Sequence, residues 1–228
     1  MKKLEHELDV FRHRLVDMAN LTEKMVRHVV GALEDPQGNA NIKSIIEDED
    51  RLDLMQLQID KEAIRLLTVY SPVAGDLRLI MSISRITAEL ERIGDHTVNI
   101  SESLQLLQTR NETDILPSIT KMADSVSGMI HDALDAFAQN DIDKAQSVIA
   151  GDNIIDVLND QIMNELLSME TVRQILEGAK DIAGALGQLL VVRSLERIAD
   201  QATNVSEEVV YMVKGDDIRH RSLVDRTK

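Results

Sequence analysis

Apolar side chains recur at three- and four-residue steps along this chain, which is the pattern of amphipathic helices. The first segment carries it clearly, at Leu4, Leu8, Phe11, Leu15, Met18, Met25 and Val29. Such spacing forms one apolar stripe along a helix of about nine turns. The run from Asp35 to Asn39 contains Pro36 and Gly38, and this turn chemistry predicts the end of the first helix.

Five further helices are predicted from the same spacing and from the turn signals between them. Their ranges are approximately 41–70, 72–107, 116–139, 143–168 and 172–214. Ser71 and Pro72 predict an N-cap followed by proline at the first helical position of the third helix. Asn140 and Asp141 predict a tight turn, and Gly215 predicts the end of the last helix.

The pattern restarts halfway along the chain, which indicates an internal repeat. Residues 90–102 and 195–207 lie 105 positions apart and are identical at eight of thirteen positions. A weaker match joins residues 49–53 to residues 152–156. We therefore predict an all-α fold made of two tandem three-helix bundles, six long antiparallel helices in all, related by an internal pseudo-two-fold axis. The predicted divisions are 1–110, 111–217 and a basic C-terminal tail, 218–228.

Composition narrows the class of protein. The chain has 228 residues, 43% of them hydrophobic, but only two Phe, two Tyr and no Trp, which is poor material for a β-sandwich. It contains no cysteine, so disulfides, thiolate zinc sites and cysteine nucleophiles are excluded. The net charge of −15 repels nucleic acids and anionic lipids, and suits metal cations or basic protein partners. The alternative is that this acidity only keeps a helical protein soluble.

Neither end of the chain nor its interior predicts a membrane protein. Residues 1–10 are charged and polar, so we expect no signal peptide there. The longest apolar runs are far shorter than the roughly 20 residues that a membrane-spanning helix needs. We therefore expect a cytoplasmic protein.

Acidic residues four positions apart form the main candidate site. The pairs are Glu49/Asp53, Glu91/Asp95, Asp152/Asp156 and Glu196/Asp200. Residues with this spacing share one helix face, where two like charges repel by roughly 0.2–0.5 kcal/mol. A bound cation reverses that repulsion, and carboxylate oxygens are suitable ligands for hard metal ions. Asn99 and Asn204 extend the second pair of each repeat by one turn and add an amide oxygen.

The spacing by itself has low specificity in so acidic a chain. Seven acid-to-Asp pairs occur at this step, where random placement would produce about four. Four of them gain weight because they occupy equivalent positions in the two repeats. The alternative is a solvated acidic face in which Arg92 and Arg197 pair with neighbouring carboxylates.

Other candidate chemistry is weak. His96 has no counterpart in the second repeat, where Gln201 replaces it, and the remaining histidines show no ligand spacing. The sequence shows no glycine-rich phosphate loop, nucleophile elbow or catalytic triad, so we expect a protein that is not an enzyme.

At these motifs the chain resembles the PhoU family over essentially its full length. The residues that carry the resemblance are the two copies of Leu-Glu-Arg-Ile-x-Asp-x-x-x-Asn at 90–99 and 195–204, the acidic pairs at 49–53 and 152–156, the segment Pro72 to Arg78, and the ending 210–220. The resemblance implies two three-helix bundles whose acidic motifs bind metal, as multinuclear iron clusters or as other divalent or trivalent ions such as Zn, Mn or Mg.

Carried onto this chain, the resemblance implies the metal ligands Glu49, Asp53, Glu91, Asp95, Asp152, Asp156, Glu196 and Asp200, with Asn99 and Asn204 as supporting ligands. It also implies an accessory regulator that links the ATPase subunit of a phosphate ABC transporter to a sensor histidine kinase. Such a regulator represses the phosphate-starvation response, and many members form homodimers. It would reach the membrane only through these partners and would bind no nucleic acid.

Two departures from the first repeat affect the second one. Ala199 and Gln201 stand where the first repeat has Gly94 and His96, and the junction between the fifth and sixth helices lacks the Pro-x-Ala-x-Asp-Leu-Arg sequence of the first half. We therefore expect a second metal site that is weaker or differently occupied.

Two other functions remain as alternatives. One is a carboxylate-bridged di-metal oxidoreductase of the ferritin-like kind, but those bundles use a Glu-x-x-His step and this chain contains none. The other is a structural helical interaction protein without metal, in which the acids are surface residues.

Overall fold

Six helices and no strand make up the part of the chain that the computed structural model describes, residues 2–35, 42–109, 115–168 and 182–219. The helices are α1 (Lys2–Glu34), α2 (Ile42–Tyr70), α3 (Ala74–Thr109), α4 (Pro117–Gln139), α5 (Ile142–Leu166) and α7 (Ile182–Lys214). The predicted all-α fold of long helices is confirmed. None of these described helices has a stretch apolar and long enough to span a lipid bilayer.

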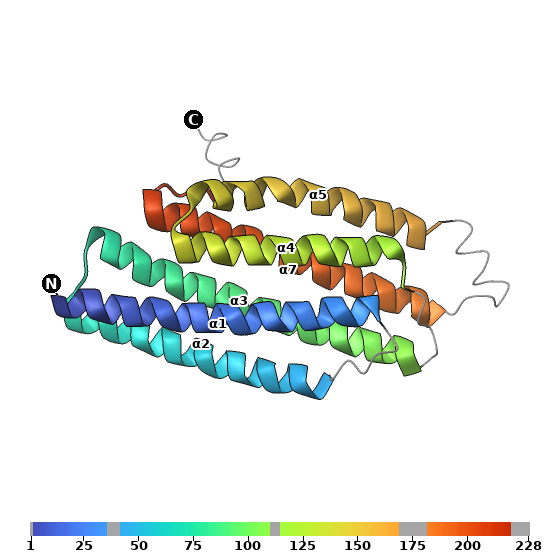
Figure 1. Ribbon diagram of the computed structural model, residues 1–228, viewed down its shortest axis with the longest axis horizontal. Helices are drawn as coiled ribbons and strands as arrows, with labels where there is room; N and C mark the ends of the chain where they lie inside the picture. Colours follow the sequence, from blue (N-terminus) through green and yellow to red (C-terminus); the bar gives the residue numbers. More distant parts are fainter. Residues whose placement is uncertain (1, 36–41, 110–114, 169–181, 220–228) are drawn as a thin grey trace.

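The helices form two bundles that lie side by side (Figure 1). In the first repeat α1, α2 and α3 pack on one another, and in the second repeat α4, α5 and α7 do the same. The repeats meet through α3 against α7, the most extensive contact between any two helices, and through α1 against α4. Two pairs of equivalent helices, α1 with α4 and α3 with α7, therefore contact each other, in agreement with the predicted pseudo-two-fold axis, and α2 and α5 lie on the outside.

Two predicted boundaries fall on residues outside the described ranges. The start of the last helix, predicted near residue 172, lies in the stretch 169–181, and most of the predicted tail lies in 220–228. Those boundaries and the predicted division between residues 110 and 111 stay predictions.

The apolar stripe of α1 forms part of the common core. Six of its seven predicted positions, from Leu8 to Val29, are buried, and Leu4 packs against the core at the helix start. Phe11 on α1 and Phe137 on α4 are the largest fully buried side chains. The three- and four-residue spacing therefore identified the buried face of this helix correctly.

The predicted turn at Asn140 and Asp141 is confirmed. Asn140 adopts a left-handed conformation (φ 55°) and closes α4 with bonds from its N–H to the carbonyls of Ala136 and Phe137. The Asp141 side chain then accepts a hydrogen bond from the Lys144 N–H at 3.0 Å and caps α5.

The predicted N-cap at Ser71 is wrong, because Ser71 ends α2 instead of starting α3. Its backbone is left-handed (φ 44°) and its N–H donates to the Leu67 carbonyl at 3.1 Å. That bond satisfies a carbonyl at the end of α2, so α3 begins only at Ala74, past Pro72. Proline occupies the first helical position in α4 instead, at Pro117.

Arg12 joins the two repeats where α1 crosses the end of α4. Its Nη2 donates to the carbonyl of Phe137 at 2.6 Å and to Asn140 Oδ1 at 2.8 Å. The guanidinium also lies 5.0 Å from the centre of the Phe137 ring. A cation placed at the end of a helix stabilises the carbonyls that have no partner within that helix.

Replacing Arg12 with alanine should therefore weaken the contact between the repeats. We expect Arg12→Ala to lower the free energy of unfolding by about 1–2 kcal/mol, because charged hydrogen bonds and a cation–π contact are lost together. Urea denaturation measures this change. Arg14→Ala, at an exposed position of the same helix, is the control and should change it by less than about 0.5 kcal/mol. Equal effects of the two variants would contradict a specific role for Arg12.

Candidate carboxylate sites and the contact between α3 and α7

The first group of candidate ligands lies where α2 packs on α3. Leu52 of α2 is fully buried against Gly94 of α3, so close that a Cβ on Gly94 would stand 2.5 Å from Leu52 Cδ2. This glycine therefore permits the close approach of the two helices. The acids that flank the contact are Glu49 and Asp53 on α2 and Glu91 and Asp95 on α3.

These four acids, the first carboxylate cluster, repel one another. Burial raises the pKa of Glu49, and the negative charges of Asp53, Asp95 and Glu91 raise it further. Burial and the charges of Asp95 and Asp53 likewise raise the pKa of Glu91. Burial and the charge of Asp53 raise the pKa of Asp95, opposed by His96. The structure therefore brings together all four predicted carboxylates of the first repeat.

The second carboxylate cluster lies between α5 and α7. Burial raises the pKa of Asp152, followed by the charges of Asp156 and Asp200. Asp200 accepts a hydrogen bond from Arg197 Nη1 at 3.2 Å. Glu196 precedes Asp200 by one turn on α7 and is half-buried. Three predicted carboxylates of this repeat therefore interact, and an arginine offsets part of their charge.

The arginines of the repeated motif make different contacts in the two repeats. Arg92 pairs with Glu89 at 2.9 Å, an acid outside the first cluster, whereas Arg197 pairs with Asp200 inside the second. The alternative in which arginines neutralise the acidic face is therefore realised in the second repeat at one carboxylate. In the first cluster, Arg92 lowers the pKa of Glu91 and His96 lowers that of Asp95, so the mutual repulsion is offset only in part.

The two asparagines lie in the contact between α3 and α7. Asn204 donates from Nδ2 to Glu89 Oε2 at 3.2 Å, and this bond crosses from α7 to α3. Asn99 lines a pocket between the same two helices. Their role as supporting ligands stays a prediction.

The donor chemistry of the clusters fits a hard metal ion, because every candidate ligand in them, apart from the two supporting asparagines, is a carboxylate. Their raised pKa values show a repulsion that a cation would relieve. The side chains do not yet form a closed ligand shell, since within the described ranges no three His, Asp or Glu side chains converge as a ready metal-binding group. A metal at these positions requires the carboxylates to rearrange around it.

Sequence reasoning missed a buried acid, Glu208 on α7. Its side chain is 5% exposed and accepts hydrogen bonds from Arg219 Nη1 at 2.6 Å and Arg85 Nη1 at 3.3 Å. Ser82 of α3 donates to the same carboxylate at 3.2 Å. A buried charge persists only with such partners. The sequence signal was its position on an apolar face, three residues after Val205 and four before Met212.

Comparison with known proteins agrees with the repeat and the motifs. The PhoU domain matches this chain twice, over residues 15–104 and 119–209. The chain belongs to the PhoU family. The resemblance inferred from the repeated motifs is thereby confirmed, and each match contains both acidic pairs of its repeat.

Curated relatives extend over nearly the whole chain. It is 38% identical over 219 residues to the phosphate-specific transport system accessory protein PhoU homolog of Pseudomonas putida, covering 95% of this chain and 83% of the relative. It is 36% identical to the homolog of Clostridium acetobutylicum, covering 95% and 97%. It is 32% identical to the accessory protein PhoU of Escherichia coli, covering 94% and 86%.

Solved structures share the fold of this PhoU family member. The crystal structure of PhoU from Pseudomonas aeruginosa superposes with a TM-score of 0.83 at 34% identity, covering 93% of this chain and 99% of that one. The phosphate transport system regulatory protein PhoU from Streptococcus pneumoniae superposes with a TM-score of 0.82 at 24% identity, which supports the fold alone.

The repulsion within the first carboxylate cluster predicts a pH-dependent gain in stability for Asp95→Asn. The folded protein raises the pKa of Asp95, so the charged carboxylate destabilises the fold as pH rises through the ordinary and then the raised pKa. At pH 7 in chelator, the variant should be more stable than wild type by a few tenths of a kcal/mol. The gain should vanish near and below the ordinary Asp pKa of about 3.9.

Urea denaturation at a series of pH values measures this dependence. Asp124→Asn, at an exposed position of α4, is the matched control for the change in charge and helix propensity. A gain at Asp95 that equals the control, or that persists unchanged at pH 4, would show that mutual repulsion is not its cause.

Proposed function

We propose that this protein is an accessory regulator of a phosphate-specific transport system. The observation that carries the proposal is likeness to PhoU accessory proteins across both repeats, at 38% identity over 95% of the chain. A likeness confined to one bundle would support only the fold. The two matched domains also retain both copies of the Leu-Glu-Arg-Ile motif, so the likeness includes the candidate site.

The regulator would act by contact, linking the ATPase subunit of a phosphate ABC transporter to a sensor histidine kinase and repressing the phosphate-starvation response. The outer helices supply suitable surfaces. Leu57 and Ile64 of α2 and Val157 of α5 are each 65% to 66% exposed. Large exposed apolar side chains on a helix face favour protein partners, including a second copy of the chain in a homodimer. The protein would be cytoplasmic, would reach the membrane only through its partners, and would perform no catalysis.

Metal binding is the second part of the proposal. The two carboxylate clusters would hold the ions, as multinuclear iron or as Zn, Mn or Mg. A bound cation supplies positive charge that offsets the repulsion among the carboxylates. Carboxylates that share an ion would then hold α2 against α3 in the first repeat and α5 against α7 in the second. Metal would therefore affect the positions of the outer helices, which are the surfaces that partners would contact.

Removal of the gene tests the regulatory role. In cells with abundant phosphate, we expect deletion to release expression of phosphate-starvation genes, measured by alkaline phosphatase activity, and wild-type protein to restore repression. Leu57→Asp should restore it poorly at equal protein level, because a charge on the exposed apolar face weakens partner docking. Asp124→Asn, away from that helix, should restore it fully. Unchanged expression after deletion would count against the proposed function.

Metal content tests the carboxylate clusters separately. For protein purified without chelator, mass spectrometry should detect several ions per chain in wild type. Asp95→Ala and Asp200→Ala should each reduce that number and the double variant should abolish most of it, because each removes a ligand from one cluster. Asp124→Ala is the control and should retain the wild-type content. Equal metal in wild type, both single variants and the double variant, or none in wild type, would assign the clusters to solvent or partner contact.

A further inference from the structure

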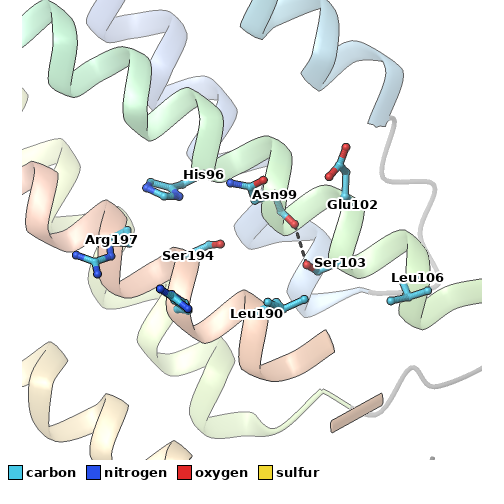
Figure 2. A pocket seen from close by; sticks show the side chains of 9 residues that line it. His96, Asn99, Glu102, Ser103, Leu106, Leu190, Ser194 and Arg197 are labelled. Carbon is cyan, nitrogen blue, oxygen red and sulfur yellow. Dashed lines mark hydrogen bonds between the residues drawn. The ribbon is translucent and has the colours of Figure 1, made fainter. Parts of the chain in front are cut away.

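A pocket of about 530 Å³ opens between α3 and α7, on the side of the contact that carries Asn99 (Figure 2). Its volume falls within the range of about 300–1,000 Å³ that is usual for small-molecule sites. One wall comes from α3 of the first repeat and the other from α7 of the second. The pocket therefore exists only because the two repeats pack together. Neither carboxylate cluster contributes a lining side chain.

One wall of the pocket carries two arginines. Arg193 and Arg197 are four residues apart on α7 and therefore stand on one helix face. Arg193 has no hydrogen-bond or ion-pair partner among the residues that the structure describes. Arg197 uses one N–H on Asp200, and a guanidinium has five, so the others are available to a ligand. Two guanidinium groups at one cleft of a chain with net charge −15 favour an anion.

The facing wall carries His96, whose Nδ1 is buried without a hydrogen-bond partner among the described residues. Figure 2 shows the imidazole projecting from α3 toward α7, close to Arg197. A buried polar atom without a partner is costly, so a ligand or a water that bonds to it is favourable.

The other end of the pocket is apolar. Leu106 and Leu190 line it with side chains that are 41% and 44% exposed. The one acid of the lining, Glu102, lies toward this end in Figure 2, with its carboxylate directed away from Arg197. The pocket therefore has a positive end and an apolar end, and its lining contains two arginines and one acid.

We propose that this pocket binds a phosphoryl group. Arg193 and Arg197 hold its oxygens, since guanidinium groups match phosphate geometry, and His96 contacts it from the opposite wall. The ligand is inorganic phosphate or the phosphate of a small ester whose carbon chain lies on Leu106 and Leu190. This site shares Arg197 with the second carboxylate cluster but contains none of the clustered carboxylates, and it does not depend on the proposed regulatory role.

Calorimetric titration of the full chain with inorganic phosphate and with glycerol 3-phosphate tests the site. Chelator is present, so phosphate bound through metal is not counted, and chloride keeps the ionic strength constant. We expect saturable binding that Arg193→Gln weakens at least about tenfold, because a charged hydrogen-bond donor is lost. Arg193 is exposed, so the variant should fold, as circular dichroism will verify. Arg27→Gln, at an exposed arginine of α1, is the matched control and should bind like wild type.

The two ligands distinguish the source of the phosphoryl group. Tighter binding of inorganic phosphate, unaffected by Leu190→Ala, assigns the site to the free ion. Tighter binding of the ester, weakened by Leu190→Ala, assigns it to an organic phosphate. The proposal is overturned if neither ligand binds saturably, or if Arg193→Gln and Arg27→Gln have the same affinity. Because metal is removed, such a result leaves the regulatory proposal and the metal experiment untouched.

Discussion

The packing of α3 against α7 is the contact on which the rest of the structure depends. Each helix belongs to a different repeat, and each buries one apolar face against its own bundle and another against its counterpart. Ile93 and Ile198, at equivalent positions of the two repeats, are both fully buried. A three-helix unit alone would expose such a face to water, at a cost of about 25 cal/mol for each Å². Two repeats side by side remove that exposure, so the fold requires both halves.

That contact also separates two kinds of acidic residue. Glu208 lies within it, loses its hydration, and is stabilised by Arg85 and Arg219. The carboxylate clusters lie farther out, where α2 and α5 cover α3 and α7, and there acids face acids. A buried carboxylate without a cation would be far too costly, whereas a half-exposed cluster costs only modest repulsion. The half-exposed positions therefore keep free charge available to a cation from solution.

The two repeats share one backbone plan but differ in side-chain chemistry at equivalent positions. Gly94 admits Leu52 so closely that no side chain fits there, whereas the second repeat has a buried Ala199 at the equivalent position. His96 contributes to the pocket, while its counterpart Gln201 is buried. Arg197 joins a carboxylate cluster and Arg92 does not. Exact symmetry would produce two identical clefts, and these substitutions make the cleft beside Arg197 distinct.

Periodic spacing and repetition were enough to predict the helical class, the repeat, the buried stripe of α1 and the turn at Asn140, because each depends on residues close in sequence or on comparison of the chain with itself. Ser71 was misjudged, since the hydrogen bond that ends α2 competes with the local preference for an N-cap. The spacing of the acids also placed each pair on one face. Tertiary packing alone decided which pairs meet, which arginine neutralises them, how Glu208 is satisfied, and that Arg193 and His96 line one pocket. Those contacts join helices far apart in sequence, and helix geometry by itself contains no information about them.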